Sequence, residues 1–374
     1  DPKAAERFAL KQSQAFVDQM EGFALELEDE LMNFSDVSYK SFVKSESEII
    51  TLFYDKFADI PLLSRMDAVA ETFIDEIETL LNRDLPEEER IPLIEKFRKM
   101  YETMDFYVLY NRFLKKEGYQ TLPRRPLEKR KLRYEDVYPI LYLKYRLSRQ
   151  AERSNIKHLV IDEMQDYSLL QYLIIRRMFS CKMTILGDRA QTMADQQQDV
   201  LQFLPGIFGK DLRRIEMRKS YRNTVEIASY AANLIGVTDL ELFERHGMPV
   251  LERDVTDLEA ALREAVDTLL PDEKTYETAA VIVPDEKTAE RAYLILRGIL
   301  AEKDFDCGKR LSWLNRDSSS FKKGLTVTTF YLAKGLEFDQ VFSIFPKDEK
   351  REIMMQAQYI AATRALHELR VYHI

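Results

Sequence analysis

Residues 157–168 read KHLVIDEMQDYS, and the rest of the chain can be interpreted outward from this stretch. Four apolar or β-prone residues, His158 to Ile161, lead directly into an acidic group that turn-forming residues follow. A short apolar run of this kind is typical of a buried parallel strand, which shows no alternation because both of its faces are covered. In an open α/β sheet, chemistry takes place beyond the carboxyl ends of the strands. The pattern therefore predicts a functional site at Asp162 and Glu163.

Asp162 and Glu163 together suit a nucleotide site. An aspartate at a strand end can hold a Mg²⁺ ion, usually through water. The glutamate beside it can orient or deprotonate an attacking water. The alternative is a capped loop whose acids are only solvated, and one short motif does not exclude it. Motifs further along the chain decide between the two interpretations.

Four further motifs occur downstream in a fixed order. They are TILGDRAQ (184–191), SYRN (220–223), TTFYLAKGLEFD (328–339) and AATRA (361–365). Together with DEMQD, this set resembles the motifs of superfamily one helicases of the UvrD/Rep type. The resemblance implies a bacterial motor ATPase of α/β class. Its RecA-like P-loop NTPase parallel sheets would comprise part of the first motor domain and the whole of the second, with a large all-α insertion.

The resemblance also implies catalytic roles for five residues. Asp162 would support Mg²⁺, and Glu163 would activate the hydrolytic water. Gln191 would report the γ-phosphate, while Arg222 and Arg364 would approach it as arginine fingers, which can contribute about 10³–10⁵ in rate. A surface salt bridge is the alternative for each arginine taken singly. Their positions in ordered motifs favour the functional interpretation.

Five other residues would bind the nucleotide or couple it to nucleic acid. Tyr221 is placed to stack on the adenine of ATP, and Glu337 is the expected ribose contact, with Gly335 in the same nucleotide-binding motif. Thr329 and Lys334 lie in the motif that usually couples nucleotide state to nucleic acid. ATP and Mg²⁺ are therefore the expected cofactors.

The phosphate-binding loop is missing from the sequence. Gly-x-x-x-x-Gly-Lys-Ser/Thr occurs nowhere in the 374 residues, although a motor of this type needs it to cradle the phosphates. We expect a C-terminal fragment whose phosphate loop lies upstream in a longer ATP hydrolase. The alternative is a degenerate domain that never binds ATP. In either case this chain alone should hydrolyse ATP negligibly.

Three domains are predicted along the chain. Residues 1–154 read as an almost wholly helical insertion domain, including one helix from Pro86 to Gly118. In this domain Phe16, Met20, Phe23, Leu27 and Leu31 follow the three-and-four spacing of one helical face, and Val69, Phe73, Ile77 and Leu80 repeat the pattern. Residues 155–235 read as the second half of the first RecA-like domain, with strands at 158–162, at 183–187 and around 214–217. Residues 236–374 read as the second RecA-like domain. Its expected elements are the strands 279–283, 325–328, 340–344 and 369–372 and the helices 288–300 and 355–366, the last carrying Arg364.

Two stretches of the helical part allow two interpretations each. Tyr101, Phe106, Tyr107, Tyr110 and Phe113 could stack on bases, but their helical spacing favours a place in the core. The basic run RRPLEKRKLR (124–133) could contact phosphates. It could equally be a solvated connection between helices, which we favour slightly.

Composition limits the possible partners. The net charge of −9 supplies no broad electrostatic attraction for nucleic acid and suits a protein partner at least as well. No apolar run is long enough to span a membrane, and Cys181 and Cys307 have no ligand or redox spacing. We therefore expect a cytoplasmic protein without a membrane span, a metal-binding cysteine pair or an evident obligate oligomer.

Two departures from DNA-unwinding relatives indicate the subfamily. Residues 300–325 leave room for only a loop or short hairpin, where such relatives carry a large extra domain. No aromatic residue follows Gln191 to stack on single-stranded bases. Both departures favour the HelD-type factors, which act on bacterial RNA polymerase. A UvrD-type or helicase IV-type DNA helicase, with DNA as partner, is the alternative, and a non-enzymatic protein-binding module is a third.

Overall fold

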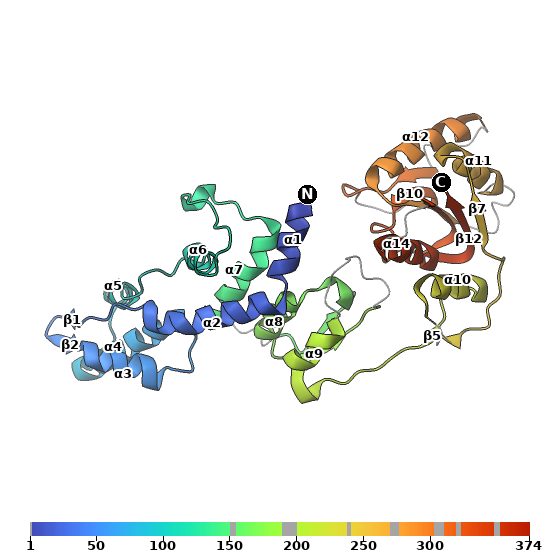
Figure 1. Ribbon diagram of the computed structural model, residues 1–374. Coiled ribbons are helices and arrows are strands. Elements are labelled where there is room, and N and C mark those ends of the chain that lie inside the picture. Colours follow the sequence, from blue (N-terminus) through green and yellow to red (C-terminus); the bar gives the residue numbers. More distant parts are fainter. Residues whose placement is uncertain are drawn as a thin grey trace. The chain divides into compact units, whose positions relative to one another are not determined.

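The computed structural model describes residues 2–149, 155–188, 200–237, 241–269, 277–302, 310–318, 323–347 and 352–374. The chain divides into two compact units (Figure 1). The helical unit contains residues 1–187 and 198–212, and the sheet unit contains residues 188–197 and 213–374. These two units are defined by which residues pack together. The three predicted domains are defined by the kind of fold expected for each stretch, and they stay a prediction.

The helical unit is built mainly from α-helices joined by short turns. Among the described residues, the antiparallel hairpin β1–β2 interrupts the pattern, which was predicted to be almost wholly helical. The elements, in chain order, are α1 (Pro2–Lys11), α2 (Gln14–Glu30), β1 (Val37–Tyr39), β2 (Phe42–Lys44), α3 (Glu46–Thr51), a π-helical turn (Leu52–Lys56), a 3₁₀ turn (Leu62–Ser64), α4 (Arg65–Leu81), α5 (Glu87–Arg98), α6 (Phe106–Lys116), a 3₁₀ turn (Leu127–Lys129), α7 (Tyr134–Leu147), β3 (His158–Ile161), a 3₁₀ turn (Met164–Asp166), α8 (Leu169–Met178), β4 (Lys182–Ile185), α9 (Val200–Phe208) and a 3₁₀ turn (Gly209–Asp211).

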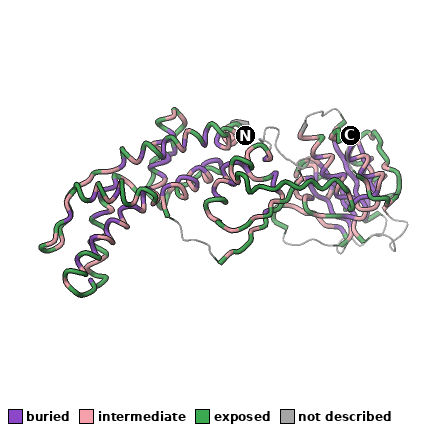
Figure 2. Tube along the Cα trace, turned by 90° about the horizontal axis from the view of Figure 1, so that it is seen from below, coloured by how far each residue is buried: buried purple, intermediate pink, exposed green. Residues whose placement is uncertain are grey.

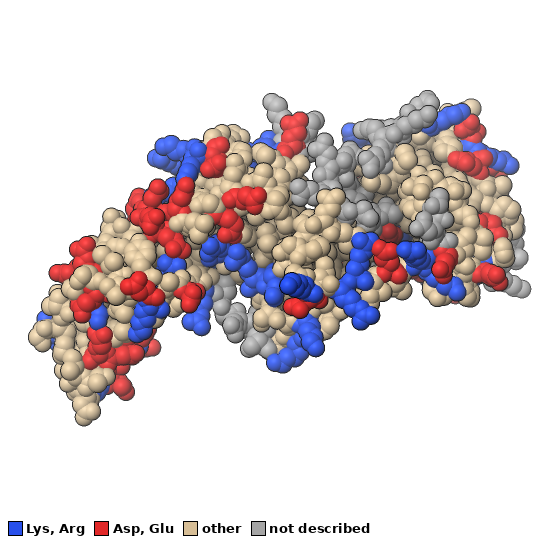
Figure 3. Space-filling view, turned by 60° about the horizontal axis from the view of Figure 1, so that its bottom comes forward, with Lys and Arg blue, Asp and Glu red and all other residues tan. Residues whose placement is uncertain are grey.

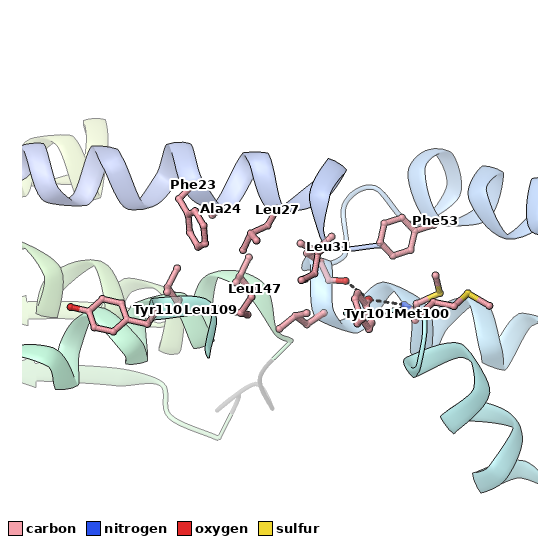
Figure 4. Packing of buried hydrophobic residues seen from close by; sticks show 14 of the residues in the cluster. Phe23, Ala24, Leu27, Leu31, Phe53, Met100, Tyr101, Leu109, Tyr110 and Leu147 are labelled. Atoms are coloured by element: carbon pink, nitrogen blue, oxygen red, sulfur yellow. Dashed lines mark hydrogen bonds between the residues drawn. The ribbon is translucent and has the colours of Figure 1, made fainter. Parts of the chain in front are cut away.

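A large hydrophobic core runs through the helices of the helical unit. Figure 4 shows side chains of α2 facing those of α6 and α7 across this core. The prediction of an apolar face on α2 is confirmed, since Phe16, Met20, Phe23, Leu27 and Leu31 are all buried. The core also includes α8 residues, so the segment after 155 packs with the predicted insertion.

The aromatic residues between 101 and 113 also pack in the core, where Tyr101, Tyr107, Tyr110 and Phe113 are buried and Phe106 is half-buried, which confirms the core interpretation. The predicted helix from Pro86 to Gly118 is wrong, however, because the chain leaves helical geometry between α5 and α6. The Tyr101 hydroxyl donates to the Leu62 carbonyl and accepts from the Met66 N–H, as the dashed lines in Figure 4 mark. Asp105 then caps α6 by accepting from the Tyr107 N–H. These tertiary bonds and a new cap outweigh helical continuity.

The β3 strand, which precedes the acidic pair, is only half covered. It pairs in parallel with β4, and the faces that carry Ile161 and Ile185 pack against α8 and α9. On the opposite face Val160 is 60% exposed and Leu186 is 46% exposed. The expectation that both faces of this strand are buried is therefore wrong within the described part of the chain.

The sheet unit contains a six-stranded parallel sheet in the order β7-β12-β11-β8-β10-β9. The elements are β5 (Lys219–Ser220), α10 (Val225–Ile235), β6 (Glu241–Leu242), β7 (Leu251–Asp254), α11 (Leu258–Leu269), β8 (Thr278–Val283), α12 (Glu286–Glu302), β9 (Leu311–Trp313), β10 (Gly324–Thr329), β11 (Phe338–Phe345), α14 (Glu352–Thr363) and β12 (Ala365–His373).

Helices cover both faces of this sheet. α11 and α12 pack on one face, and α10 and α14 pack on the other (Figure 1). The central strands are consequently buried throughout, as Figure 2 shows for the interior of this unit. The predicted α/β class with a parallel sheet is confirmed, and so are the predicted strands on β8, β10, β11 and β12.

Two local predictions in this part of the chain are wrong. The expected strand around 214–217 does not form, because residues 212–218 run exposed and pair with no described strand, and only β5 and β6 pair nearby. The helix expected at 355–366 ends at Thr363. Arg364 therefore lies in the turn between α14 and β12. The turn allows the Phe338 N–H to bond the Arg364 carbonyl at 2.9 Å, which continues the pairing of β11 with β12.

Candidate nucleotide site

Asp162 and Glu163 lie where the sequence places them, directly after β3 in the helical unit. The Glu163 backbone is left-handed, with φ 53° and ψ 50°, a conformation that costs a non-glycine residue free energy. The Asp162 carboxylate is exposed, and its Oδ1 accepts from the Glu163 N–H at 2.8 Å. Backbone strain that is held in place in this way is typical of functional sites.

Gln165 and Gly187 help to hold this strained turn. The buried Gln165 donates from Nε2 to Glu163 Oε2 at 2.6 Å, which orients the carboxylate. A Cβ on Gly187 would lie 2.4 Å from Met164 Cγ and 2.5 Å from Gln165 Oε1. Only glycine therefore lets the end of β4 approach the loop so closely. The Met164 N–H bonds the Leu186 carbonyl at 2.8 Å, which fixes the two strand ends together.

Arg222 and Glu337, both in the sheet unit, form an ion pair. Arg222 Nε lies 2.6 Å from Glu337 Oε1, and the side chains are 45% and 43% exposed. From the sequence, Arg222 is expected to contact the γ-phosphate and Glu337 the ribose. The structure brings these two residues together.

Arg364 lies close to the same motif but is buried. Only 2% of the residue is exposed, and it is the largest fully buried side chain among the described residues. Its guanidinium donates to the Leu336 carbonyl at 3.4 Å, to the Ile360 carbonyl at 3.3 Å and to the Thr363 hydroxyl at 3.2 Å. In this conformation Arg364 holds together the loop before β11 and the end of α14.

Sequence reasoning gave no role to two residues that organise this region. Asn223 is buried and donates from Nδ2 to the Ala365 carbonyl at 2.6 Å and to the Thr363 carbonyl at 3.3 Å. Arg245 donates to the Arg222 carbonyl and, at 2.8 Å, to the Leu366 carbonyl. They thereby tie the Arg222 segment to the turn that carries Arg364. The position of Asn223 within the SYRN motif was a signal that could have found it.

Tyr221, the predicted adenine contact, is exposed and has an aromatic neighbour. Its ring is 5.6 Å from that of Phe243, and Lys219 Nζ lies 5.5 Å and 5.7 Å from the two ring centroids. Tyr221 is 59% exposed and Phe243 is 45% exposed. The pairing of β5 with β6 explains this contact, because it brings the segment that carries Phe243 beside Tyr221. The ring is therefore available for stacking.

The remaining predicted residues differ in their surroundings. Gly335 has φ 81°, which favours glycine at the turn before β11. Thr329 is buried at the end of β10, and its hydroxyl has no hydrogen-bond partner among the described residues. Lys334 is half-buried in the turn after it. Gln191 lies outside the described residues.

Asp162 is the predicted metal ligand among the described residues. Asp162 is an exposed strand-end carboxylate, which suits Mg²⁺ bound through water and phosphate oxygens. No group of three or more His, Cys, Asp or Glu that could hold a metal ion by itself occurs in the part of the chain that the structure describes. Mg²⁺ would therefore depend on a bound nucleotide for most of its ligands.

Comparison with known proteins places these features in a family. The model of the UvrD/REP helicase N-terminal domain matches residues 6–193, which is half of the chain. The chain therefore belongs to the UvrD/REP helicase family, within superfamily one. No curated protein matches it. None of the helices described in the structure is both long and apolar enough to span a membrane.

Two solved structures are similar to parts of the chain. One is the C-terminal domain of a possible DNA helicase from Lactobacillus plantarum WCFS1, at 24% identity and a TM-score of 0.33, covering 41% of this chain and 88% of that one. The other is the PRRSV helicase, at 15% identity and a TM-score of 0.31, covering 71% of this chain and 45% of that one.

Proposed function

We propose that this chain belongs to an ATP-dependent helicase-like motor, and that the motor is of the HelD type, acting on bacterial RNA polymerase. Membership in the UvrD/REP helicase family supports the first part. The strained and tightly held Glu163 beside an exposed Asp162 is the structural observation that carries it.

Each group has a defined task in this proposal. Asp162 would hold Mg²⁺ through water, and the Glu163 carboxylate, oriented by Gln165, would accept a proton from the attacking water. Bound ATP would supply the phosphoanhydride that is cleaved. Arg222 would leave Glu337 to neutralise negative charge on the phosphates, while Tyr221 would stack on the base.

The acidic composition of one end of the helical unit supports a protein partner. Residues 36–98, from the β1–β2 hairpin to α5, carry 15 acidic and 8 basic side chains. Acidic side chains are spread over this end in Figure 3. Val43, Leu80 and Ile91 on these elements are 58%, 71% and 57% exposed. Leu80, predicted from its spacing to share the buried face of α4, is one of them. Exposed apolar side chains among acids suit a basic protein surface better than phosphates.

The short connection before β10 supports the HelD assignment over a DNA-unwinding one. Between α12 and β10 the described residues form only the three-residue edge strand β9. A UvrD-type or helicase IV-type DNA helicase is the second candidate, and family membership is compatible with it. A protein-binding module without catalysis is the third.

A first experiment tests whether the missing phosphate loop prevents this chain from hydrolysing ATP. The purified chain should release negligible phosphate from ATP, since its sequence contains no phosphate-cradling loop. The same assay on Glu163→Gln gives the background rate. Robust turnover that the substitution abolishes would show that another part of the chain cradles the phosphates.

A second experiment separates the two kinds of motor. The chain is used to capture purified core RNA polymerase at physiological salt, and its binding to single-stranded DNA and its unwinding of a tailed duplex are measured beside it. We expect tighter retention of polymerase than of DNA. Leu80→Asp with Ile91→Asp should weaken retention, whereas Leu294→Asp, 58% exposed on α12, should not. Efficient unwinding with no polymerase retained would favour the DNA helicase.

A further inference from the structure

The loop between α6 and α7, seen in Figure 1, contains four cationic side chains for which no acidic partner is found among the described residues. Several arginines and lysines of the helical unit lie in ion pairs, such as Arg98 with Asp67 at 2.7 Å and Lys44 with Glu76 at 2.7 Å. The exposed side chains of the basic loop, residues 120–133, differ from them. Among the described residues, no hydrogen-bond or ion-pair partner is found for the side chains of Arg124, Arg125, Lys129 and Lys131.

This basic loop is held in one conformation by its other residues. Arg130 pairs with Asp105 at 2.6 Å, lies 4.6 Å from the centroid of the Tyr107 ring and donates to the Arg125 carbonyl at 3.0 Å. The Leu122 N–H donates to Asn111 Oδ1 at 2.7 Å. A simple solvated connection would not need these anchors. The free cations are therefore held on a fixed segment.

An exposed aromatic ring comes directly after the loop. Tyr134, the first residue of α7, is 65% exposed. One face of its ring stacks on Phe8 at 5.6 Å and an interplanar angle of 17°, and its edge meets Tyr138 at 6.0 Å. The stack fixes the ring orientation and leaves much of the side chain open to solvent.

We propose that the basic loop and Tyr134 form a binding site for single-stranded nucleic acid. The cations would contact successive phosphates, and the open face of Tyr134 would stack on one base. An acidic protein surface would also satisfy the cations, but it gives no role to an oriented ring. This site is independent of the polymerase proposal.

The test measures binding of a fluorescent oligothymidylate of about 20 nucleotides to the full chain by anisotropy, from low to physiological salt. The wild-type affinity should fall with salt. Replacing all four free cations with Gln should weaken binding at least about tenfold and lower the slope of log K against log salt by about 3, since each phosphate contact on a single strand contributes about 0.7. The matched control removes four unpaired exposed cations of the same unit, namely Arg83, Lys99, Lys115 and Lys144. It should change affinity less than about twofold.

Tyr134 variants test the stacking step. Tyr134→Ala should weaken binding about tenfold, and Tyr134→Phe should bind like the wild type because the ring remains. An equal effect of the loop and control variants would overturn the proposal. So would competition by polyglutamate as strong as that by oligothymidylate, which would point to an acidic protein. Unchanged binding by Tyr134→Ala would overturn the single-strand assignment, and a parallel oligouridylate measurement distinguishes RNA from DNA.

Discussion

Arg222 Nε lies 2.6 Å from Glu337 Oε1, so the two residues expected to contact opposite ends of a nucleotide neutralise one another. Both side chains are nearly half exposed, and exposed ion pairs of this kind contribute less than about 1 kcal/mol. An anionic phosphate can therefore replace Glu337 beside Arg222 at little cost. The ion pair with Glu337 orients the Arg222 side chain but is weak enough to be exchanged for a phosphate.

The two arginines should differ sharply in their effect on stability. Arg222→Ala should change the free energy of unfolding by less than about 1 kcal/mol. Arg364→Ala should cost at least about 2 kcal/mol, because it leaves a cavity and carbonyl groups without donors. Urea unfolding of the two variants measures this. Equal stabilities of the two variants would contradict the buried role of Arg364.

Gly187→Ala should disturb the Glu163 turn. The new methyl group would overlap Met164 and Gln165, so either β4 or the loop must move. We expect a loss of at least about 1 kcal/mol by thermal or urea unfolding. Gly298→Ala is the control, because that glycine lies inside α12 with open space around it, and alanine there should stabilise by about 0.5–1 kcal/mol. Equal behaviour of the two variants would show that Gly187 tolerates a side chain.

The buried pair of Lys11 and Asp136 should be costly to break. Their side chains are 6% and 1% exposed, and the Tyr110 hydroxyl also donates to Asp136 at 2.8 Å. Burial and the adjacent Asp136 carboxylate raise the pKa of Tyr110, so this hydroxyl stays protonated. Lys11→Met leaves a buried carboxylate without its cation and should cost about 3–5 kcal/mol. Lys115→Met, exposed on α6, should be nearly neutral, and a similar loss in both would refute the assignment.

Glu226 should make the sheet unit sensitive to acid. Its carboxylate bonds His246 at 2.9 Å and the Gly247 N–H at 2.8 Å, and these bonds, His246 first, lower the pKa of Glu226 to about 2. Since the folded pKa lies below the ordinary 4.5, the stabilisation is present above that pH and is lost as pH falls towards about 2. The stability difference between wild type and Glu226→Gln should shrink over this range. A constant stability difference between the two proteins over this range would contradict the assignment.

Sequence patterns predicted the elements that local residue order determines. The run Ala279–Val283 predicted β8, and the acidic pair after β3 predicted the turn at Asp162 and Glu163. Helical spacing predicted the core face of α2. In each case the residues that decide the structure are neighbours in the sequence.

Features that depend on residues far apart in the sequence could not be predicted from sequence patterns. The helix breaks after α5 because the Tyr101 hydroxyl bonds two distant groups. These are the Leu62 carbonyl, in the turn before α4, and the Met66 N–H, in the first turn of α4. Burial of Arg364 depends on carbonyl groups from residues 336 and 360. A strand was expected around 214–217, but a strand needs a neighbour with which to pair, and none is found among the described residues.

The strand order of the sheet unit has a consequence for how this unit is made. β12 lies between β7 and β11, and Leu251 of β7 pairs with Arg370 of β12. During synthesis β7 therefore cannot pair with β12 until more than 110 further residues have been added to the chain. Contacts of such high sequence separation slow folding. A ribosome pausing before residue 365 would hold β7 and β11 apart with a missing strand between them, a state in which their open edges are most exposed to aggregation.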